Sequence, residues 1–158
     1  MQRYTISVLV ENKFGVLTRV TGLFSGRGYN IDTLNVGPTH DETLSRMTIV
    51  TRGDAATVEQ IVKQLDKLID VVKVIEYKAG AYIDRELVLI KVKTEPQNRA
   101  EVCQVAELFR AKVVDVQTES ITIEITGGES KIEKFIRLMK DFGILELTRT
   151  GQVALPRS

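Results

Sequence analysis

Apolar and polar residues alternate at the start of the chain, where Tyr4, Ile6, Val8 and Val10 are separated by mostly polar positions. A period of two residues predicts a strand with one buried face. The apolar residues that follow have helical spacing, so they predict an amphipathic helix over residues 16–26 with Gly28 just beyond its end. The rest of this half predicts strands at 30–36 and 45–51, a helix at 58–69 capped by Asp54 or Thr57, and a strand at 71–77.

The second half of the chain repeats this order of elements. Alternation is strict at residues 121–126, and the spacing of Ile132, Phe135, Ile136 and Met139 is helical. The full set of predicted elements is a strand at 86–93, a helix at 102–109, strands at 112–117 and 121–126, a helix at 132–139, a strand at 144–149 and a short tail at 151–156.

Two βαββαβ units in series predict an α+β protein made of two tandem ferredoxin-like domains. Each would have a four-stranded antiparallel sheet with both helices on one face. The short break at residues 78–81 places the boundary, with domains at residues 1–78 and 79–158. Domains of this size have small cores, and their sheets leave open edges, so we expect an oligomer.

Composition and charge exclude several classes of function. The 22 Lys and Arg residues almost balance the 21 Asp and Glu residues, so no net field attracts nucleic acid or an anionic membrane. An RNA-recognition module has the same element order, but the predicted strand at 45–51 carries no aromatic side chain for base stacking. No export signal or membrane span is visible, and one cysteine allows no internal disulfide, so we expect a cytoplasmic protein.

No catalytic or metal-binding set can be assembled from the residue types. The single histidine, His40, falls in a predicted loop, and Cys103 falls on the apolar side of a predicted helix. We therefore expect no metal and no catalytic residue in this chain. Gly26-Arg27-Gly28 ends a helix, whereas a dinucleotide fingerprint follows a strand and opens a helix, so Gly28 is interpreted as a left-handed helix terminus.

The polar turn at residues 12–15 is the remaining candidate site. It precedes a helix whose first backbone N–H groups lack partners, and such an end attracts anions. Asn12 can donate to a carboxylate and accept from an ammonium group, and Gly15 has no Cβ to obstruct a ligand. A free amino acid fits this chemistry. The alternative is that Asn12 only caps the helix and Gly15 only relieves the turn.

Several motifs resemble the ACT domain of the regulatory small subunit of acetolactate synthase, also called acetohydroxyacid synthase. The strongest are LVENKFGVLTRV at residues 9–20 and GLFSGRGYNI at residues 22–31. Further matches are LSRMTI at 44–49, KQLDKLIDV at 63–71, REL at 85–87, FRAKVVDV at 109–116 and RTG at 149–151. The resemblance covers nearly the whole chain. Ala111, Gly37 and residues 94–98 depart from the family pattern.

The resemblance implies a non-catalytic subunit that activates the acetolactate synthase large catalytic subunit. It also implies feedback inhibition by a branched-chain amino acid, usually valine, bound at the interface of an ACT-domain homodimer. The chain itself would hold no cofactor, while thiamine diphosphate, Mg and FAD are expected on the catalytic partner. The implied effector-binding residues are Asn12, Gly15 and Val16 from one protomer, Asn30 and Ile31 from the facing protomer, and Val36 against the effector side chain.

Two rival hypotheses remain open at this point. One is a free-standing ACT-type sensor of amino acids that serves a different enzyme, and the resemblance of the second domain argues against it. The other is a small enzyme whose residues form no recognisable motif.

Overall fold

The computed structural model describes residues 2–158, which form two compact units. Unit 1 comprises the residues up to Ile83 together with Gln152–Ser158, and unit 2 comprises Asp84–Gly151. The predicted division at residues 78 and 79 differs from these units in two places. Residues 79–83 lie with unit 1, and so does the C-terminal segment from Gln152 onward.

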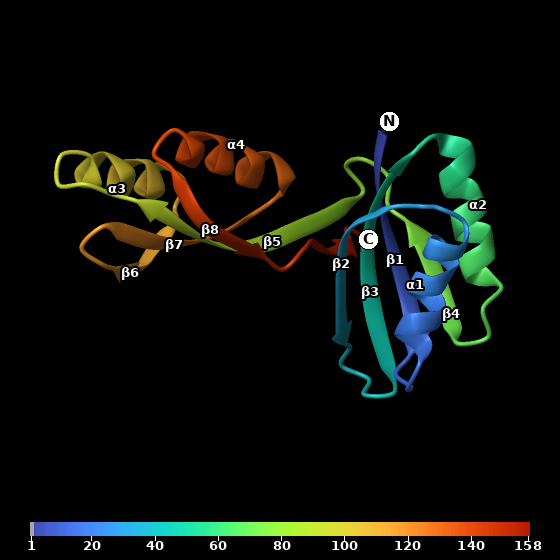
Figure 1. Cartoon of the computed structure of the whole chain (residues 1–158). Coiled ribbons are helices and arrows are strands. Elements are labelled where there is room, and N and C mark those ends of the chain that lie inside the picture. Colours follow the sequence, from blue (N-terminus) through green and yellow to red (C-terminus); the bar gives the residue numbers. More distant parts are fainter. Residues whose placement is uncertain (1) are drawn as a thin grey trace. The chain divides into compact units, whose positions relative to one another are not determined.

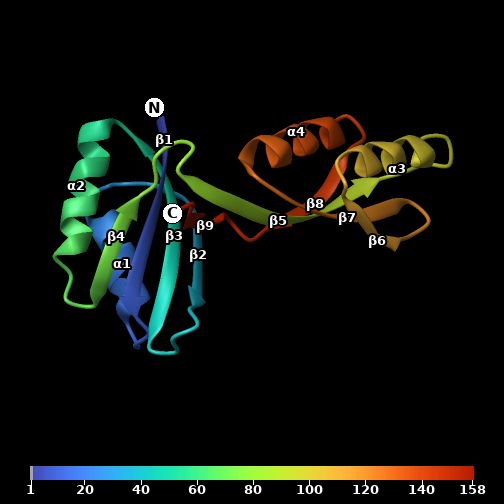
Figure 2. The same cartoon turned by 180° about the vertical axis from the view of Figure 1, so that it is seen from behind.

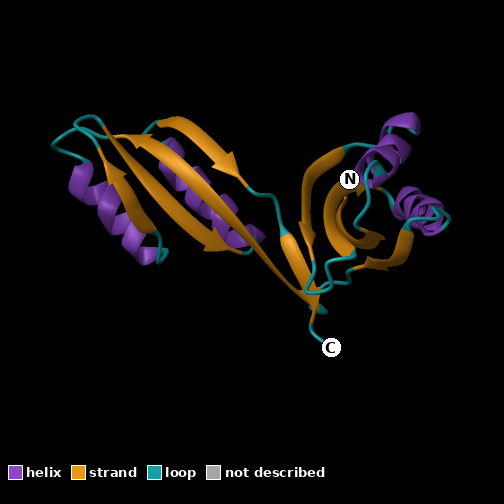
Figure 3. Cartoon of the chain, turned by 90° about the horizontal axis from the view of Figure 1, so that it is seen from below, coloured by secondary structure: helices purple, strands orange, loops and turns teal. Residues whose placement is uncertain are grey.

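Unit 1 has the predicted βαββαβ order. Its elements are β1 (Gln2–Glu11), α1 (Val16–Gly26), β2 (Ile31–Pro38), β3 (Leu44–Gly53), α2 (Ala55–Asp66) and β4 (Val71–Glu76). The strands form an antiparallel sheet in the order β2-β3-β1-β4, and both helices cover the same face of it (Figures 1 and 3). The alternating residues Ile6, Val8 and Val10 of β1 pack into the core against Val20 and Phe24 of α1.

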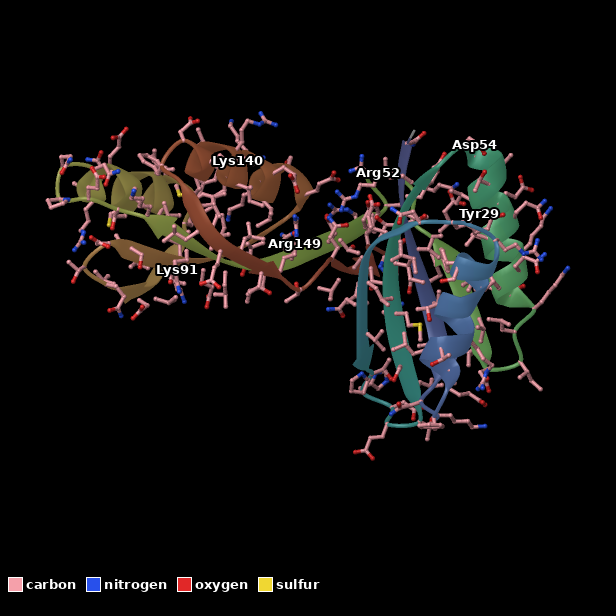
Figure 4. All side chains as sticks on the ribbon, viewed as in Figure 1. Tyr29, Arg52, Asp54, Lys91, Lys140 and Arg149 are labelled. Atoms are coloured by element: carbon pink, nitrogen blue, oxygen red, sulfur yellow. The ribbon has the colours of Figure 1, made fainter. Side chains whose placement is uncertain are left out.

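Helix α1 ends where the sequence predicted, at a left-handed glycine. Gly28 has φ +70°, and its N–H donates to Ser25 O at 3.2 Å, while Tyr29 N–H donates to Phe24 O at 2.9 Å. These two hydrogen bonds are those of a Schellman motif, which satisfies the last carbonyls of a helix. The rings of Phe24 and Tyr29 make an edge contact at 6.5 Å (Tyr29 is labelled in Figure 4), so the chain turns directly into β2.

Helix α2 begins at the predicted cap. The Asp54 side chain accepts a hydrogen bond from Thr57 N–H, with Oδ1 and N 2.7 Å apart (Asp54 is labelled in Figure 4). This hydrogen bond holds the pKa of Asp54 below its usual value, because it stabilises the carboxylate. The prediction that Asp54 caps this helix is therefore confirmed.

A glycine inside α1 offers a test of the helix's own stability. Gly22 is exposed, and a Cβ at this position would meet nothing within 4 Å. We expect Gly22→Ala to stabilise unit 1 by about 0.5–1 kcal/mol, because alanine loses less backbone entropy on folding. Urea unfolding checks this. Gly28→Ala is the matched control and should destabilise, because its φ is positive; a loss of stability in Gly22→Ala would contradict the prediction.

Unit 2 repeats the plan. Its elements are β5 (Tyr82–Lys93), which begins in unit 1, then α3 (Arg99–Leu108), β6 (Lys112–Val116), β7 (Ser120–Gly127), α4 (Glu129–Lys140) and β8 (Ile144–Arg149). The strand order is β6-β7-β5-β8, and α3 and α4 cover one face (Figure 1). Phe135 and the isoleucines of β7 lie in the core, and Cys103 is partly buried against it. The predicted pair of ferredoxin-like units is confirmed.

The C-terminal segment, which the sequence predicted only as a short tail, contains the strand β9 (Val153–Pro156). This strand pairs with β5 (Figure 2). Arg157 N–H donates to Ala81 O at 2.9 Å, and the Tyr77 hydroxyl donates to Ala154 O at 3.3 Å. A four-residue strand ending in proline carries too short a pattern to be recognised. Its pairing also explains why β5 starts at Tyr82 rather than at residue 86.

Candidate functional site

The polar turn between β1 and α1 is held by the loop that joins β2 to β3. Asn12 N–H donates to Thr43 O at 2.7 Å, and the Asn12 side-chain Nδ2 donates to Glu42 O at 3.1 Å. The N-cap of α1 is Gly15, not Asn12. The alternative that Asn12 serves as the cap of this helix is therefore wrong, and its side chain instead fixes the turn against the neighbouring loop.

Gly15 adopts a conformation that other residues avoid, with φ +86° and ψ −9°. Within residues 2–158, no side chain caps α1, and its first turn contains no acidic residue. Val16 N–H donates to Lys13 O at 3.5 Å, and the next backbone N–H groups of the helix are available to an anion. The helix dipole favours negative charge there. The turn thus provides an uncapped helix N-terminus beside an exposed asparagine.

Sequence reasoning missed two charged residues at this turn, Arg19 and Asp70. Arg19 Nε donates to Asp70 Oδ2 at 2.7 Å, and a second guanidinium nitrogen contacts the same oxygen. A Cβ placed on Gly15 would lie 3.2 Å from Arg19 Nη1, so the guanidinium lies directly over the glycine. The pair is separated by 51 residues in the sequence, and only the fold brings it together.

Val16, predicted to contact an effector, is buried in the core of unit 1. Its side chain packs with Val20 and Phe24 against the sheet. Only the backbone of Val16 can therefore face a ligand at the turn, and its N–H group already donates to Lys13 O at 3.5 Å.

Asn30 and Ile31 lie at the other end of the same sheet. Ile31 is paired with Thr51, and Thr51 is paired with Tyr4, eight residues before Asn12 along the chain. At about 3.3 Å per residue, the two groups are separated by about 26 Å. The Asn30 side chain donates to Asp32 Oδ1 at 3.1 Å, and its backbone carbonyl accepts from the Thr51 hydroxyl. One chain therefore does not bring the six predicted residues into a single site.

Val36 lies on β2, which is an edge strand, and its side chain is 42% exposed. Leu17 on α1 is 44% exposed. Leu17 and Arg19 are two residues apart, about 200° around the helix, so they face opposite flanks. Because Arg19 reaches Asp70 beside β4, Leu17 faces the flank towards β2. The edge of the sheet and the helix above it thus expose apolar side chains on the same side.

The signature residues of unit 2 form a structural ion-pair network. Glu86 is 3% exposed, and Arg149 donates from Nε to Glu86 Oε1 at 3.1 Å and from Nη2 to Glu133 Oε1 at 3.1 Å (Arg149 is labelled in Figure 4). The hydrogen bonds to Glu86 hold the pKa of Arg149 above its usual value. Thr150 N–H donates to Leu87 O at 3.1 Å. These residues therefore join β5, β8 and α4.

Residues 2–158 contain no group of three or more His, Cys, Asp and Glu side chains placed to hold a metal ion. His40 lies in an exposed loop between β2 and β3, as predicted. Within the same range, no helix is long and apolar enough to cross a membrane.

Two tandem ferredoxin-like units, the first with an uncapped helix at a polar turn, define an ACT-type protein. A family profile described as "AHAS small subunit-like ACT domain" matches residues 6–73, and one described as "Small subunit of acetolactate synthase" matches residues 85–158.

Individual proteins give the same result over the full length. A probable acetolactate synthase small subunit of Archaeoglobus fulgidus is 52% identical over 98% of this chain and 97% of its own. The acetolactate synthase small subunit of Mycobacterium leprae is 50% identical over 98% of this chain and 91% of its own. The crystal structure of the acetolactate synthase small subunit from Thermotoga maritima matches with a TM-score of 0.89 and 42% identity, covering 100% of this chain and 99% of that one. The chain belongs to the acetolactate synthase small-subunit family.

Proposed function

We propose that this chain is the regulatory subunit of an acetolactate synthase. It activates the catalytic large subunit and makes that subunit sensitive to a branched-chain amino acid, with valine as the first candidate. Support comes from its similarity to full-length acetolactate synthase small subunits and from the ACT-type first unit. The chain has no catalytic role of its own in this proposal. Thiamine diphosphate, Mg and FAD belong to the large subunit.

The proposed effector site rests on one observation, the N-terminus of α1 at Gly15, which no side chain caps. The effector carboxylate binds the first free N–H groups of the helix, which are those of Leu17 and Thr18. The exposed Asn12 side chain has a carbonyl oxygen that can accept from the effector ammonium group. The Arg19 guanidinium over Gly15 adds positive charge on the same side of the turn. The site therefore offers partners to both charged groups of a free amino acid, its carboxylate and its ammonium group.

A homodimer through the β2 edges completes this site. In an antiparallel pair of two β2 strands, the Ile31 end of one strand lies beside the Pro38 end of the other. Pro38 pairs with Ser45, which pairs with Val10, so that end of the sheet is next to the Asn12 turn. The partner subunit's Asn30 and Ile31 then reach the effector, and Val36 and Leu17 become buried. The dimer thus brings together the Asn12 turn and the Asn30–Ile31 pair, which lie about 26 Å apart within one chain.

Calorimetry with valine tests the site. Asn12→Ala should weaken valine binding by about 10-fold to 100-fold, because a hydrogen bond to a charged group contributes about 1.5–3 kcal/mol. Thr43→Ala is the matched control, since it removes only the hydroxyl that donates to Asp41 Oδ1 in the supporting loop. Wild-type affinity in Asn12→Ala would refute the assignment.

The role itself is tested with purified subunits. The chain alone should form no acetolactate from pyruvate, whereas adding it to the large subunit should raise activity and confer inhibition by valine. Turnover by the chain alone would support the small-enzyme hypothesis, and valine binding without any effect on the large subunit would support a free-standing sensor. An allosteric coupling of about 1–3 kcal/mol corresponds to a 5-fold to 150-fold effect.

A further inference from the structure

One end of unit 1 exposes large apolar side chains that the effector site and the β2 edge do not use. Ile69 is 94% exposed, Phe14 is fully exposed and Val72 is about half exposed. We call these three residues the Ile69 patch. Side chains of this size are rarely left in water together on a protein surface unless they contact a partner.

Backbone contacts bring the three residues to the same end of the sheet. Glu11 N–H donates to Asp70 O at 2.9 Å, which joins the turn that carries Phe14 to the corner that carries Ile69. Val71 pairs with Val10 and Lys73 with Leu9, so a bulge leaves Val72 without a partner on β1. Figure 1 shows the β1–α1 turn and the α2–β4 corner at the lower end of unit 1.

The unpaired charges beside Ile69 and Val72 are mostly positive. Neither Lys67 nor Lys73 forms an ion pair with any residue in the range 2–158, and the same holds for one carboxylate, Asp66. Lys13 is paired with Glu11, and Arg19 with Asp70. The side of the patch at Ile69 and Val72 therefore carries one net positive charge, which fits a partner surface that is apolar and acidic there. The β2–β3 loop brings the carboxylates of Asp41 and Glu42 to the Phe14 side.

We propose that the Ile69 patch is the surface through which this chain docks onto the catalytic large subunit. The inference rests on the proposed function, because it names the surface used by the partner that the function requires. The docked surface presents apolar side chains to Ile69, Phe14 and Val72 and carboxylates to Lys67 and Lys73. Desolvated apolar anchors with a charged rim are the usual construction of a protein interface.

A second copy of the chain is a poorer occupant of this patch. In the proposed homodimer, unit 1 associates through β2, which is the opposite edge of the sheet from β4. A two-fold copy would also bring its own unpaired Lys67 and Lys73 to the same rim, where like charges repel. Neither objection applies to the catalytic large subunit.

The position of the patch also gives a physical route for regulation. Asp70 follows Ile69 directly, and its carboxylate is bound by Arg19, whose guanidinium lies over Gly15. A carboxylate bound at the α1 N-terminus therefore meets the side chain that holds the Ile69 corner in place. Effector binding changes the hydrogen-bond partners of Arg19. The Ile69 corner, which docks onto the large subunit, then loses or shifts its contact with Arg19. The two sites thus share one ion pair.

The test is a titration of the large subunit with the full-length chain, reading acetolactate formation. Ile69→Asp should shift the midpoint of activation to about tenfold higher chain concentration or more, as expected for loss of an interface anchor. Leu108→Asp is the matched control, because Leu108 is 82% exposed in unit 2 and should leave the midpoint unchanged. Calorimetry with valine and sedimentation of the chain alone are measured for each variant.

The outcomes separate this inference from the proposed function. Weaker activation by Ile69→Asp, with wild-type valine binding and an unchanged oligomeric state, supports the inference. A wild-type midpoint in Ile69→Asp overturns it while leaving the proposed function intact. Dissociation of a dimer by Ile69→Asp also overturns it, because a second copy would then cover the patch. Failure of the wild-type chain to activate the large subunit would refute the proposed function itself.

Discussion

Replacing Arg149 with methionine is expected to destabilise unit 2 by about 3 kcal/mol. The substitution leaves the Glu86 carboxylate buried without its cation, and removing one partner of a buried ion pair costs about 3–5 kcal/mol. The lower end applies because the Arg149 side chain is 34% exposed. Since a unit of this size rarely holds more than about 3–5 kcal/mol, unit 2 should be close to unfolding at room temperature. Hydrogen exchange of the β5, β7 and β8 amides measures the loss within that unit.

Two companion variants show whether the buried charge is the cause. Glu133→Gln removes only the exposed partner of Arg149 and should change stability by less than about 1 kcal/mol. The double variant Glu86→Met with Arg149→Met removes both buried charges and should recover most of the lost stability, because apolar replacements of buried ion pairs are often neutral. If the double variant is no more stable than Arg149→Met alone, the loss comes from packing and not from an unpaired carboxylate.

Periodicity was sufficient to predict the elements of both units, because each buries a face that its spacing reveals. The exceptions depend on contacts between residues far apart in the chain. Strand β9 and the first residues of β5 form together, and neither segment carries enough alternation to be recognised alone. The boundary between the units depends on the same pairing, since it returns the C-terminal segment to unit 1.

The candidate site was predicted in part. Asn12 and Gly15 could be identified because a polar residue and a glycine just before an apolar helix form a pattern that neighbouring residues alone reveal. Arg19 and Asp70 belong to no such local pattern, since each resembles an ordinary surface charge until the fold brings the two together. The RTG signature at residues 149–151 was recognised only by resemblance, and its reason is the buried Glu86 on another strand.

Gly15→Asp is expected to weaken valine binding by about 100-fold or more. The new carboxylate would lie beside the Arg19 guanidinium and at the helix N-terminus, where the effector carboxylate is proposed to bind. Like charges in contact cost several kcal/mol, and about 2.7 kcal/mol already corresponds to 100-fold. The left-handed backbone at φ +86° adds a further penalty for any side chain. Calorimetry of the purified chain with valine gives the affinity directly.

Charge and backbone strain are separated by two further variants. Gly15→Asn has nearly the same size and tolerates the left-handed backbone, but it carries no charge, so its loss of affinity should be clearly smaller. Gly80→Asp introduces the same carboxylate at φ +80° in an exposed turn where a Cβ meets nothing within 4 Å, and valine binding should be unchanged. Equal losses in Gly15→Asp and Gly15→Asn would mean that the turn acts through its shape alone. Wild-type binding in both would place the effector elsewhere, because no carboxylate could then share the α1 N-terminus with a side chain at position 15.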